Sequence, residues 1–185
     1  MERNKNTQLI IIAVLAFAVM FMTVGFATYA TTLNITGTTT VSAAKWSVHY
    51  VTNSYAESTG SVVATSKTIT NTDVTYSITL AKPGDFYEFT INVINDGSFD
   101  AKLSALTMTA LTAAQQKYLT YTVTYDGTDY TASASNLANV LSCTDGSNTK
   151  VVKVRVAYVQ PENSTDLPAE EVEVTLTASL DYVQN

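Results

Sequence analysis

The chain has very few of the residues that build disulfide frameworks and metal centres. It contains one cysteine, Cys143, and one histidine, His49. A single cysteine excludes an internal disulfide, and no CxxC pair is present. Zinc needs three or four converging nitrogen, sulfur or oxygen ligands, and the sequence has no HExxH motif. We therefore expect no catalytic residues, no cofactor and no bound metal, and we expect that the protein is not an enzyme.

Charge is also scarce, because only 14% of the residues are charged and the net charge is −6. A negatively charged protein repels a polyanion, so we expect no nucleic acid among its partners. Low charge together with much Thr, Tyr, Val and Ser favours strands over helices. Short strands separated by turns, without a βαβ rhythm, predict an all-β fold. We expect a two-sheet antiparallel sandwich, jelly-roll or immunoglobulin-like, with one short helix and a preceding N-terminal apolar helix.

The first 30 residues have the order of a secretory signal. A polar start with Arg3 and Lys5 precedes an apolar run from Leu9 to Phe26, and small residues follow. Two cleavage bonds fit, after Ala27 and after Ala30, and the clean strand pattern from Thr31 favours the bond between Ala30 and Thr31. The run is also long enough to span a bilayer, so an uncleaved signal anchor is the alternative.

This pattern divides the chain into a signal peptide or signal anchor, residues 1–30, and one β-sandwich domain, residues 31–185. We expect no other anchor, since no lipoprotein cysteine follows the apolar run and residues 181–185 include no apolar segment. The stretch Leu167 to Glu171 begins like a sortase signal but lacks its Thr-Gly. We expect contact with a membrane only through the N-terminal helix, and contact with a signal peptidase during export.

The stretch from Leu80 to Ala101 carries the clearest strand signal. Pro83-Gly84-Asp85 is a turn. The residues after it alternate, and the side predicted to face the core holds Tyr87, Phe89, Ile91 and Val93. A second turn follows at Asn95-Asp96-Gly97-Ser98, before another extended stretch from Phe99 to Thr109. We therefore expect a β-hairpin, with its two strands paired.

Other segments give weaker expectations. Trp46, Val48 and Tyr50 share one face of a strand, which predicts Trp46 in the core and His49 toward solvent. A capping box of Thr112 and Gln115 predicts a helix over residues 111–119. Residues 68–80 are expected to form one strand, and residues 132–148 a connection. The strands expected over residues 151–159 and 171–183 would place glutamates opposite Lys153 and Arg155.

Three features together resemble the TasA/camelysin family of exported proteins from Gram-positive bacteria. The signal segment ends Thr28-Tyr29-Ala30, similar to the T-W-A of that family. A Thr-rich first strand precedes Trp46-Ser47-Val48, and Leu80-x-x-Pro83-Gly84-Asp85 is followed by Phe89, Asn95, Gly97-Ser98 and Ala101-Lys102. The resemblance implies a jelly-roll subunit of an extracellular biofilm-matrix fibre. It also implies a dedicated signal peptidase and a freed N-terminal strand that inserts into the next subunit.

The segment 31–41, TTLNITGTTTV, has a physical basis for such donation. Leu33, Ile35 and Val41 are its large apolar residues, and burial of each would contribute roughly 1.5–3 kcal/mol. Paired with an open sheet edge of a neighbour, the strand would build a homopolymer by head-to-tail repetition. The alternative is that residues 31–41 pair within their own domain. Minor fibre subunits are further expected partners.

Other functions have less support in the sequence. A pilin-like filament subunit would keep the apolar N-terminal helix. A secreted metalloprotease has been described among camelysin-type relatives, but this chain lacks the ligands. A surface adhesin would need exposed aromatic residues, for which Tyr55, Tyr125 and Tyr130 are the candidates. Aspartates at 126 and 129 and the acidic stretch 166–173 lack the spacing of a calcium loop, so we interpret them as a hairpin turn and a solvated loop.

Overall fold

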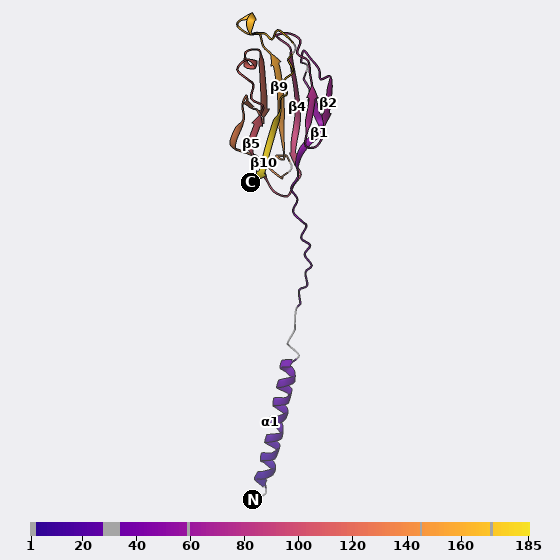
Figure 1. Ribbon diagram of the computed structural model, residues 1–185. Helices are drawn as coiled ribbons and strands as arrows, with labels where there is room; N and C mark the ends of the chain where they lie inside the picture. The colour runs from indigo at the N-terminus through magenta and orange to yellow at the C-terminus, as the bar shows by residue number, and fades with distance from the viewer. Residues whose placement is uncertain (1–2, 28–33, 59, 145, 171) are drawn as a thin grey trace. The chain divides into compact units, whose positions relative to one another are not determined.

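The structure is a computed structural model that describes residues 3–27, 34–58, 60–144, 146–170 and 172–185. The chain divides into two compact units, Met1–Ser42 and Ala43–Asn185. The first contains helix α1 (Arg3–Ala27), and all the strands lie in the second (Figure 1).

From Leu9 onward, helix α1 is apolar on all sides. Its described side chains are exposed, and the window Asn4–Phe21 has a mean hydropathy of 1.5. At 1.5 Å per residue, a helix of this length spans about 38 Å, more than the ~30 Å hydrocarbon core of a bilayer. The expected N-terminal apolar helix is therefore confirmed, and it is long and apolar enough to cross a membrane. Its role in export remains a prediction, because signal sequences and membrane anchors both have these properties.

The second unit is built from short strands and two 3₁₀ turns. The 3₁₀ turns are Gln115–Lys117 and Ser164–Asp166. The strands are β1 (Val48–Glu57), β2 (Ser66–Ile69), β3 (Val74–Ser77), β4 (Phe86–Asn95), β5 (Ala101–Met108), β6 (Leu119–Tyr125), β7 (Thr128–Tyr130), β8 (Ala134–Leu141), β9 (Thr149–Tyr158) and β10 (Ala178–Gln184).

These strands form a five-stranded sheet in the order β1-β4-β9-β6-β7 and a three-stranded sheet in the order β10-β5-β8. Strands β2 and β3 form a separate hairpin. All neighbours are antiparallel. Side chains from the two larger sheets share one core, so the predicted all-β sandwich is confirmed. The layers carrying β4 and β9 and carrying β5 and β10 are visible in Figure 1.

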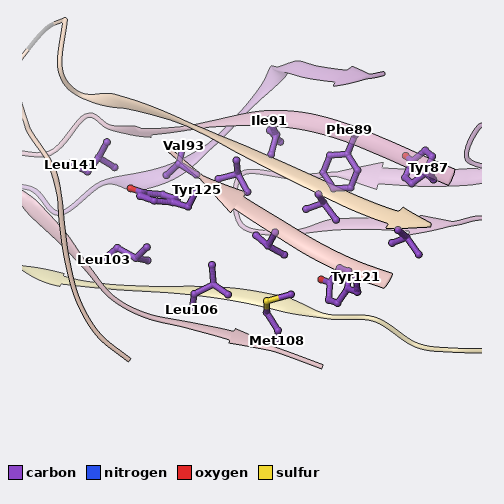
Figure 2. Packing of buried hydrophobic residues seen from close by; sticks show 14 of the residues in the cluster. Tyr87, Phe89, Ile91, Val93, Leu103, Leu106, Met108, Tyr121, Tyr125 and Leu141 are labelled. Carbon is purple, nitrogen blue, oxygen red and sulfur yellow. The ribbon is translucent and has the colours of Figure 1, made fainter. Parts of the chain in front are cut away.

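The core follows the period-2 pattern of the sequence. Along β4, buried and half-buried residues alternate over the whole strand, and its inward apolar side chains are the four that the pattern predicts. They pack with residues of β5, β6, β8 and β9. Leu103, Tyr125 and Leu141 are among the neighbours labelled in Figure 2. Every residue of this core cluster lies between positions 48 and 182. The core is therefore complete without the first unit, and the second unit should fold on its own.

The predicted hairpin of β4 and β5 is wrong, because the two strands lie in different sheets. Both edges of β4 are occupied, one by β1 and the other by β9. The turn between β4 and β5 crosses the sandwich, and buried Asn95 holds it. Its side-chain amide donates to the carbonyl oxygens of Phe99 and Leu141, and its carbonyl oxygen accepts from the Gly97 amide. Alternation identifies a buried face, but it does not identify the neighbouring strand.

The prediction for Trp46 is also wrong, since this side chain is 48% exposed. Strand β1 begins two residues later, and the backbone of Lys45 and Ser47 instead hydrogen-bonds to Ser98 and Asp96. The helix expected over residues 111–119 is shorter and consists of a single 3₁₀ turn. The capping box is present, because the Gln115 amide donates to Thr112 Oγ1 and the Thr112 amide donates to Gln115 Oε1.

Three further segments differ from the expectation. Residues 68–80 do not form one strand, because Asn71-Thr72-Asp73 turns the chain between β2 and β3. The expected connection 132–148 contains strand β8, which pairs with β5. The last strand begins at Ala178 and also pairs with β5, so its residues do not lie opposite Lys153 and Arg155. Arg155 instead donates to Glu88 on β4, at 3.0 Å.

Candidate functional site

A groove of about 700 Å³ opens between the sheets of the second unit. Its floor consists of inward residues of β4, β6 and β9, among them Ile91, Val123 and Val152. One wall is the start of β1 together with the β2–β3 hairpin. The other wall is formed by Thr175–Leu180 and Tyr182, which belong to β10 and the residues before it. Most of the side chains that line the groove are therefore aliphatic or aromatic.

The groove exists because the two sheets have unequal width. The wider sheet has five strands and the facing sheet has three, with β10 at one edge. Among the described residues, β10 has one strand neighbour, β5, so its other edge is free. Just before β10, Val174 and Leu176 pack against the core without belonging to a strand. An edge of this kind presents backbone donors and acceptors to an added strand.

Several tyrosines project into the groove from different elements. They are Tyr50 of β1, Tyr76 of β3, Tyr121 of β6 and Tyr182 of β10. Burial raises the pKa of each, to about 12 for Tyr76. The phenols also influence one another, because Tyr76 and Tyr50 further raise the pKa of Tyr121 and Tyr50 further raises that of Tyr182. We call these four groove-lining side chains the tyrosine cluster.

One hydroxyl of the tyrosine cluster is unsatisfied. Tyr182 donates to the hydroxyl of Tyr125 at 3.1 Å. In contrast, the hydroxyl oxygen of Tyr76 is buried and has no hydrogen-bond partner among the described residues. A buried hydroxyl without a partner is energetically unfavourable.

The N-terminal segment has the opposite character to the groove. Residues 34–47 contain no strand, and the side chains of residues 34–46 are exposed. Ile35 is 99% exposed and Val41 is 87% exposed. Of the other positions predicted to matter here, Ala30, Thr31 and Leu33 lie outside the described residues. Large apolar side chains at this exposure remain available for burial elsewhere.

The other candidate residues have ordinary structural surroundings. His49 Nε2 lies 3.7 Å from a carboxylate oxygen of Asp96. A hydrogen bond to the Asp100 carboxylate raises the pKa of the Cys143 thiol, which makes this thiol a weaker nucleophile. Within the described part of the chain, no three His, Cys, Asp or Glu residues are grouped closely enough to hold a metal ion.

The aromatic residues named for an adhesin are not exposed. Tyr125 is fully buried, Tyr55 stacks on Phe89, and Tyr130 packs partly buried against the core. The expectation that Tyr125 is exposed is wrong, because the side of β6 that carries this residue points toward the three-stranded sheet. The two aspartates of the β6–β7 hairpin have protein partners, since Asp126 pairs with Lys150 and Asp129 accepts from Thr124.

The sequence pattern did not indicate the groove or its tyrosine cluster. Both depend on the β2–β3 hairpin, which places Tyr76 beside the core. The signal that would have revealed this hairpin is Asn71-Thr72-Asp73, a turn-favouring stretch between two alternating runs. Comparisons with protein-family models, with curated proteins and with solved structures find no match to this chain.

Proposed function

We propose that the chain is a structural subunit of an extracellular filament, in which residues 31–41 of one subunit fill the groove of the next. One observation carries this proposal. The domain has an apolar groove beside a free strand edge, and the same chain has an exposed segment with alternating apolar residues. The groove and its strand edge offer burial and hydrogen bonds, and the exposed segment has apolar side chains and backbone groups that need them.

Simple energetics support the pairing. Moving Ile35 and Val41 from near-complete exposure into an apolar groove contributes roughly 1.5–3 kcal/mol for each side chain. Backbone hydrogen bonds to the free edge of β10 fix the strand in place. Because a subunit carries one segment and one groove, repetition of the contact produces an open chain of subunits. This function requires no catalytic residues, and the protein is proposed to be a non-enzymatic homopolymer, with room for minor subunits at its ends.

The N-terminal helix has a place in this proposal. As a secretory signal, α1 directs the chain out of a bacterial cell, and a signal peptidase cuts between Ala30 and Thr31. Cleavage frees residues 31–41 for donation, and the resemblance to exported biofilm-matrix fibre proteins fits this order of events. The second candidate is a pilin-like filament that keeps α1, which the apolar surface of this helix beyond Gln8 favours.

Mass spectrometry of the surface-exposed protein separates the two candidates. A first residue of Thr31 supports strand donation, and a retained α1 supports the pilin-like filament.

The strand-donation proposal is tested with the chain that begins at Thr31. We expect filaments by electron microscopy for this chain and none after deletion of residues 31–41. We also expect the double variant Ile35→Ser/Val41→Ser to stay monomeric. The matched control Thr36→Ser/Thr40→Ser changes the other side of the segment and should still form filaments. Unaltered filaments after the deletion would remove the proposal.

A further inference from the structure

This inference rests on the proposed function and concerns the direction and the pairing of the donated strand. The chain contains a second stretch that alternates without a strand partner. Residues 172–177, VEVTLT, precede β10, and their Val174 and Leu176 pack partly buried against the core, in phase with the inward residues of β10. No other described residue hydrogen-bonds to the backbone of residues 172–176. Backbone groups of an extended segment need such partners.

These residues are unpaired because they extend past the end of β5. Ala178 lies opposite Met108, the last residue of β5. One further bond follows, from the Thr109 amide to the Thr177 carbonyl oxygen. Within the described part of the sheet, residues 172–176 have no strand neighbour on this side, and on their other side lies the groove. We call residues 172–177 together with β10 the acceptor edge.

The pairing of β10 determines which of its amides face the groove. In an antiparallel pair, the backbone groups of alternate residues point to the partner strand, and those of the residues between them point away. The carbonyl oxygen of Thr177 points to the side of β5, where it accepts the Thr109 amide. Ala178 and Leu180 therefore direct their amides to the free edge. Their side chains pack against the core, so the core-facing residues of β10 have the unpaired amides.

The acceptor edge runs from one end of the domain to the other. It ends beside the β4–β5 turn, because the Asn185 amide donates to the Asp100 carbonyl oxygen. The chain also joins the domain at this turn, where Lys45 and Ser98 exchange hydrogen bonds. We call this the entry end of the domain. Strand β10 runs toward the entry end, and residues 172–177 precede it at the far end.

The direction of the inserted strand decides which copy of the chain can supply it. In a strand antiparallel to β10, Val41 would lie at the far end. If the strand belonged to the same chain, residues 42–44 would have to connect Val41 with Lys45 at the entry end. Four steps along the backbone reach at most about 14 Å, whereas β10 alone extends about 20 Å at 3.3 Å per residue. An antiparallel strand must therefore come from another copy.

A parallel strand would have the opposite consequence. Its Val41 would lie at the entry end, close to Lys45 of the same chain, so a segment could fill its own groove. Two copies could also exchange segments and close as a dimer, because both would be joined to their segments at the same end. Only the antiparallel direction places the donor domain beyond the far end and leaves the segment of the acceptor free for the next contact.

We propose that the acceptor edge pairs antiparallel with residues 31–41 of a second copy, and that residues 172–177 become part of a strand when this partner is bound. The two stretches match in length, since residues 31–41 are as many as residues 172–182. Each supplies the strand neighbour that the other does not have within its own subunit.

This pairing assigns the amides of the donated strand. Directly opposite residues of an antiparallel pair share a face, and the bonded ones point their backbone groups at each other. Because the acceptor amides at the groove belong to core-facing residues, the donor amides that meet them belong to the apolar face of the segment. Thr39 lies on that face with Ile35 and Val41, and Thr38 lies on the other. In a parallel pair the Thr38 amide would bond instead.

The test uses residues 43–185, which contain the complete core, and fluorescent peptides of residues 31–41. Binding is measured by fluorescence anisotropy. We expect N-methylation of the Thr39 amide to weaken binding about tenfold or more, because it removes a donor and places a methyl group against the acceptor edge. N-methylation of the Thr38 amide is the matched control. It makes the same change on the same residue type, with the amide turned away from β10, and this peptide should bind like the unaltered one.

The outcomes separate this inference from the proposed function. If methylation at Thr38 weakens binding as much as methylation at Thr39, or more, antiparallel pairing is wrong and strand donation survives. If the unaltered peptide does not bind, strand donation itself is wrong. A third outcome is binding to residues 43–185 but not to residues 31–185 that remain monomeric. It would mean that each segment fills its own groove, which overturns pairing between two copies.

Hydrogen exchange measured residue by residue tests the acceptor side. When the unaltered peptide binds, the amides of Val174 and Leu176 should become protected, because they continue the groove-facing phase of β10. The Thr175 amide is the internal control, since it points away from the added strand and should exchange as before. Unchanged exchange at Val174 and Leu176 in the complex would overturn the role of residues 172–177.

Discussion

Strand β4 and the segment 34–41 carry the same kind of sequence pattern in opposite surroundings. Each alternates apolar with polar residues, and each contains an isoleucine on its apolar face. Ile91 of β4 is 1% exposed, whereas Ile35 is 99% exposed. β4 has a hydrogen-bonded strand on both sides and a second sheet over its inward face. Residues 34–41 belong to no strand.

The difference shows that alternation requires a neighbour before it produces a strand. Backbone donors and acceptors of an extended segment need partners, and its apolar face needs a surface to cover. In β4 both needs are met within one chain. For residues 34–41 they are met in the proposed filament. The following variants break or sharpen this contrast, and the largest expected effect comes first.

The same substitution at the two isoleucines should have very different effects. Ile91→Ala should lower the free energy of unfolding by about 2–5 kcal/mol, because it leaves a cavity in the core. Ile35→Ala should change it by less than about 0.5 kcal/mol in the monomer, because the side chain is exposed. Urea denaturation of dilute chains beginning at Thr31 measures both. A comparable loss for Ile35→Ala would mean that the segment packs inside its own subunit.

Two glycines, one in the free segment and one in the domain, have opposite surroundings. A Cβ at Gly97 would lie 2.8 Å from the Lys45 carbonyl oxygen and 2.9 Å from Asn95 Oδ1, while Gly37 has nothing within 4 Å. Gly97→Ala should therefore cost about 1–3 kcal/mol by overpacking, and Gly37→Ala should leave the monomer unaffected. Hydrogen exchange of the Ser98 amide, which donates to Lys45, checks the location of the effect. Unchanged exchange and stability in Gly97→Ala would contradict it.

The smallest expected effect concerns the unpaired hydroxyl in the groove. Tyr76→Phe should raise the free energy of unfolding of the monomer by about 1 kcal/mol, since it removes a buried hydroxyl without a partner. The matched control is Tyr182→Phe, which breaks the bond to Tyr125 and should lower stability by about 1 kcal/mol. Thermal unfolding of both variants gives the comparison. A loss of stability in Tyr76→Phe would show that its hydroxyl has a partner after all.

Alternation and turn-favouring residues in the sequence correctly predicted which side of several strands faces the core, and they predicted several turns. The inward residues of β4 and β9 follow directly from alternation, and the turn at Asp126-Gly127 is present with positive φ at both residues. Pairing between strands was beyond these patterns, because a strand with one buried face fits several neighbours equally well. That is why β4 and β5 were expected to pair. Strand β8 was missed because its alternation is weak, with small or polar residues at positions 134–136, 138 and 139.

Of the two parts of the candidate site, the sequence predicts the apolar segment but not the groove. Leu33, Ile35 and Val41 are visible as an apolar face in the sequence. The groove results from the unequal widths of two sheets, which depends on contacts between residues far apart in the chain.

The position of β10 in the chain has a consequence for the timing of assembly. One wall of the groove consists of Thr175–Leu180 and Tyr182, which follow every other strand in the sequence. The segment 31–41 precedes them all. In the proposed filament, synthesis and export would therefore deliver the inserting part first and complete the receiving part last. A nascent chain would lack a complete groove, so it would not capture a finished neighbour before its own last strand had emerged.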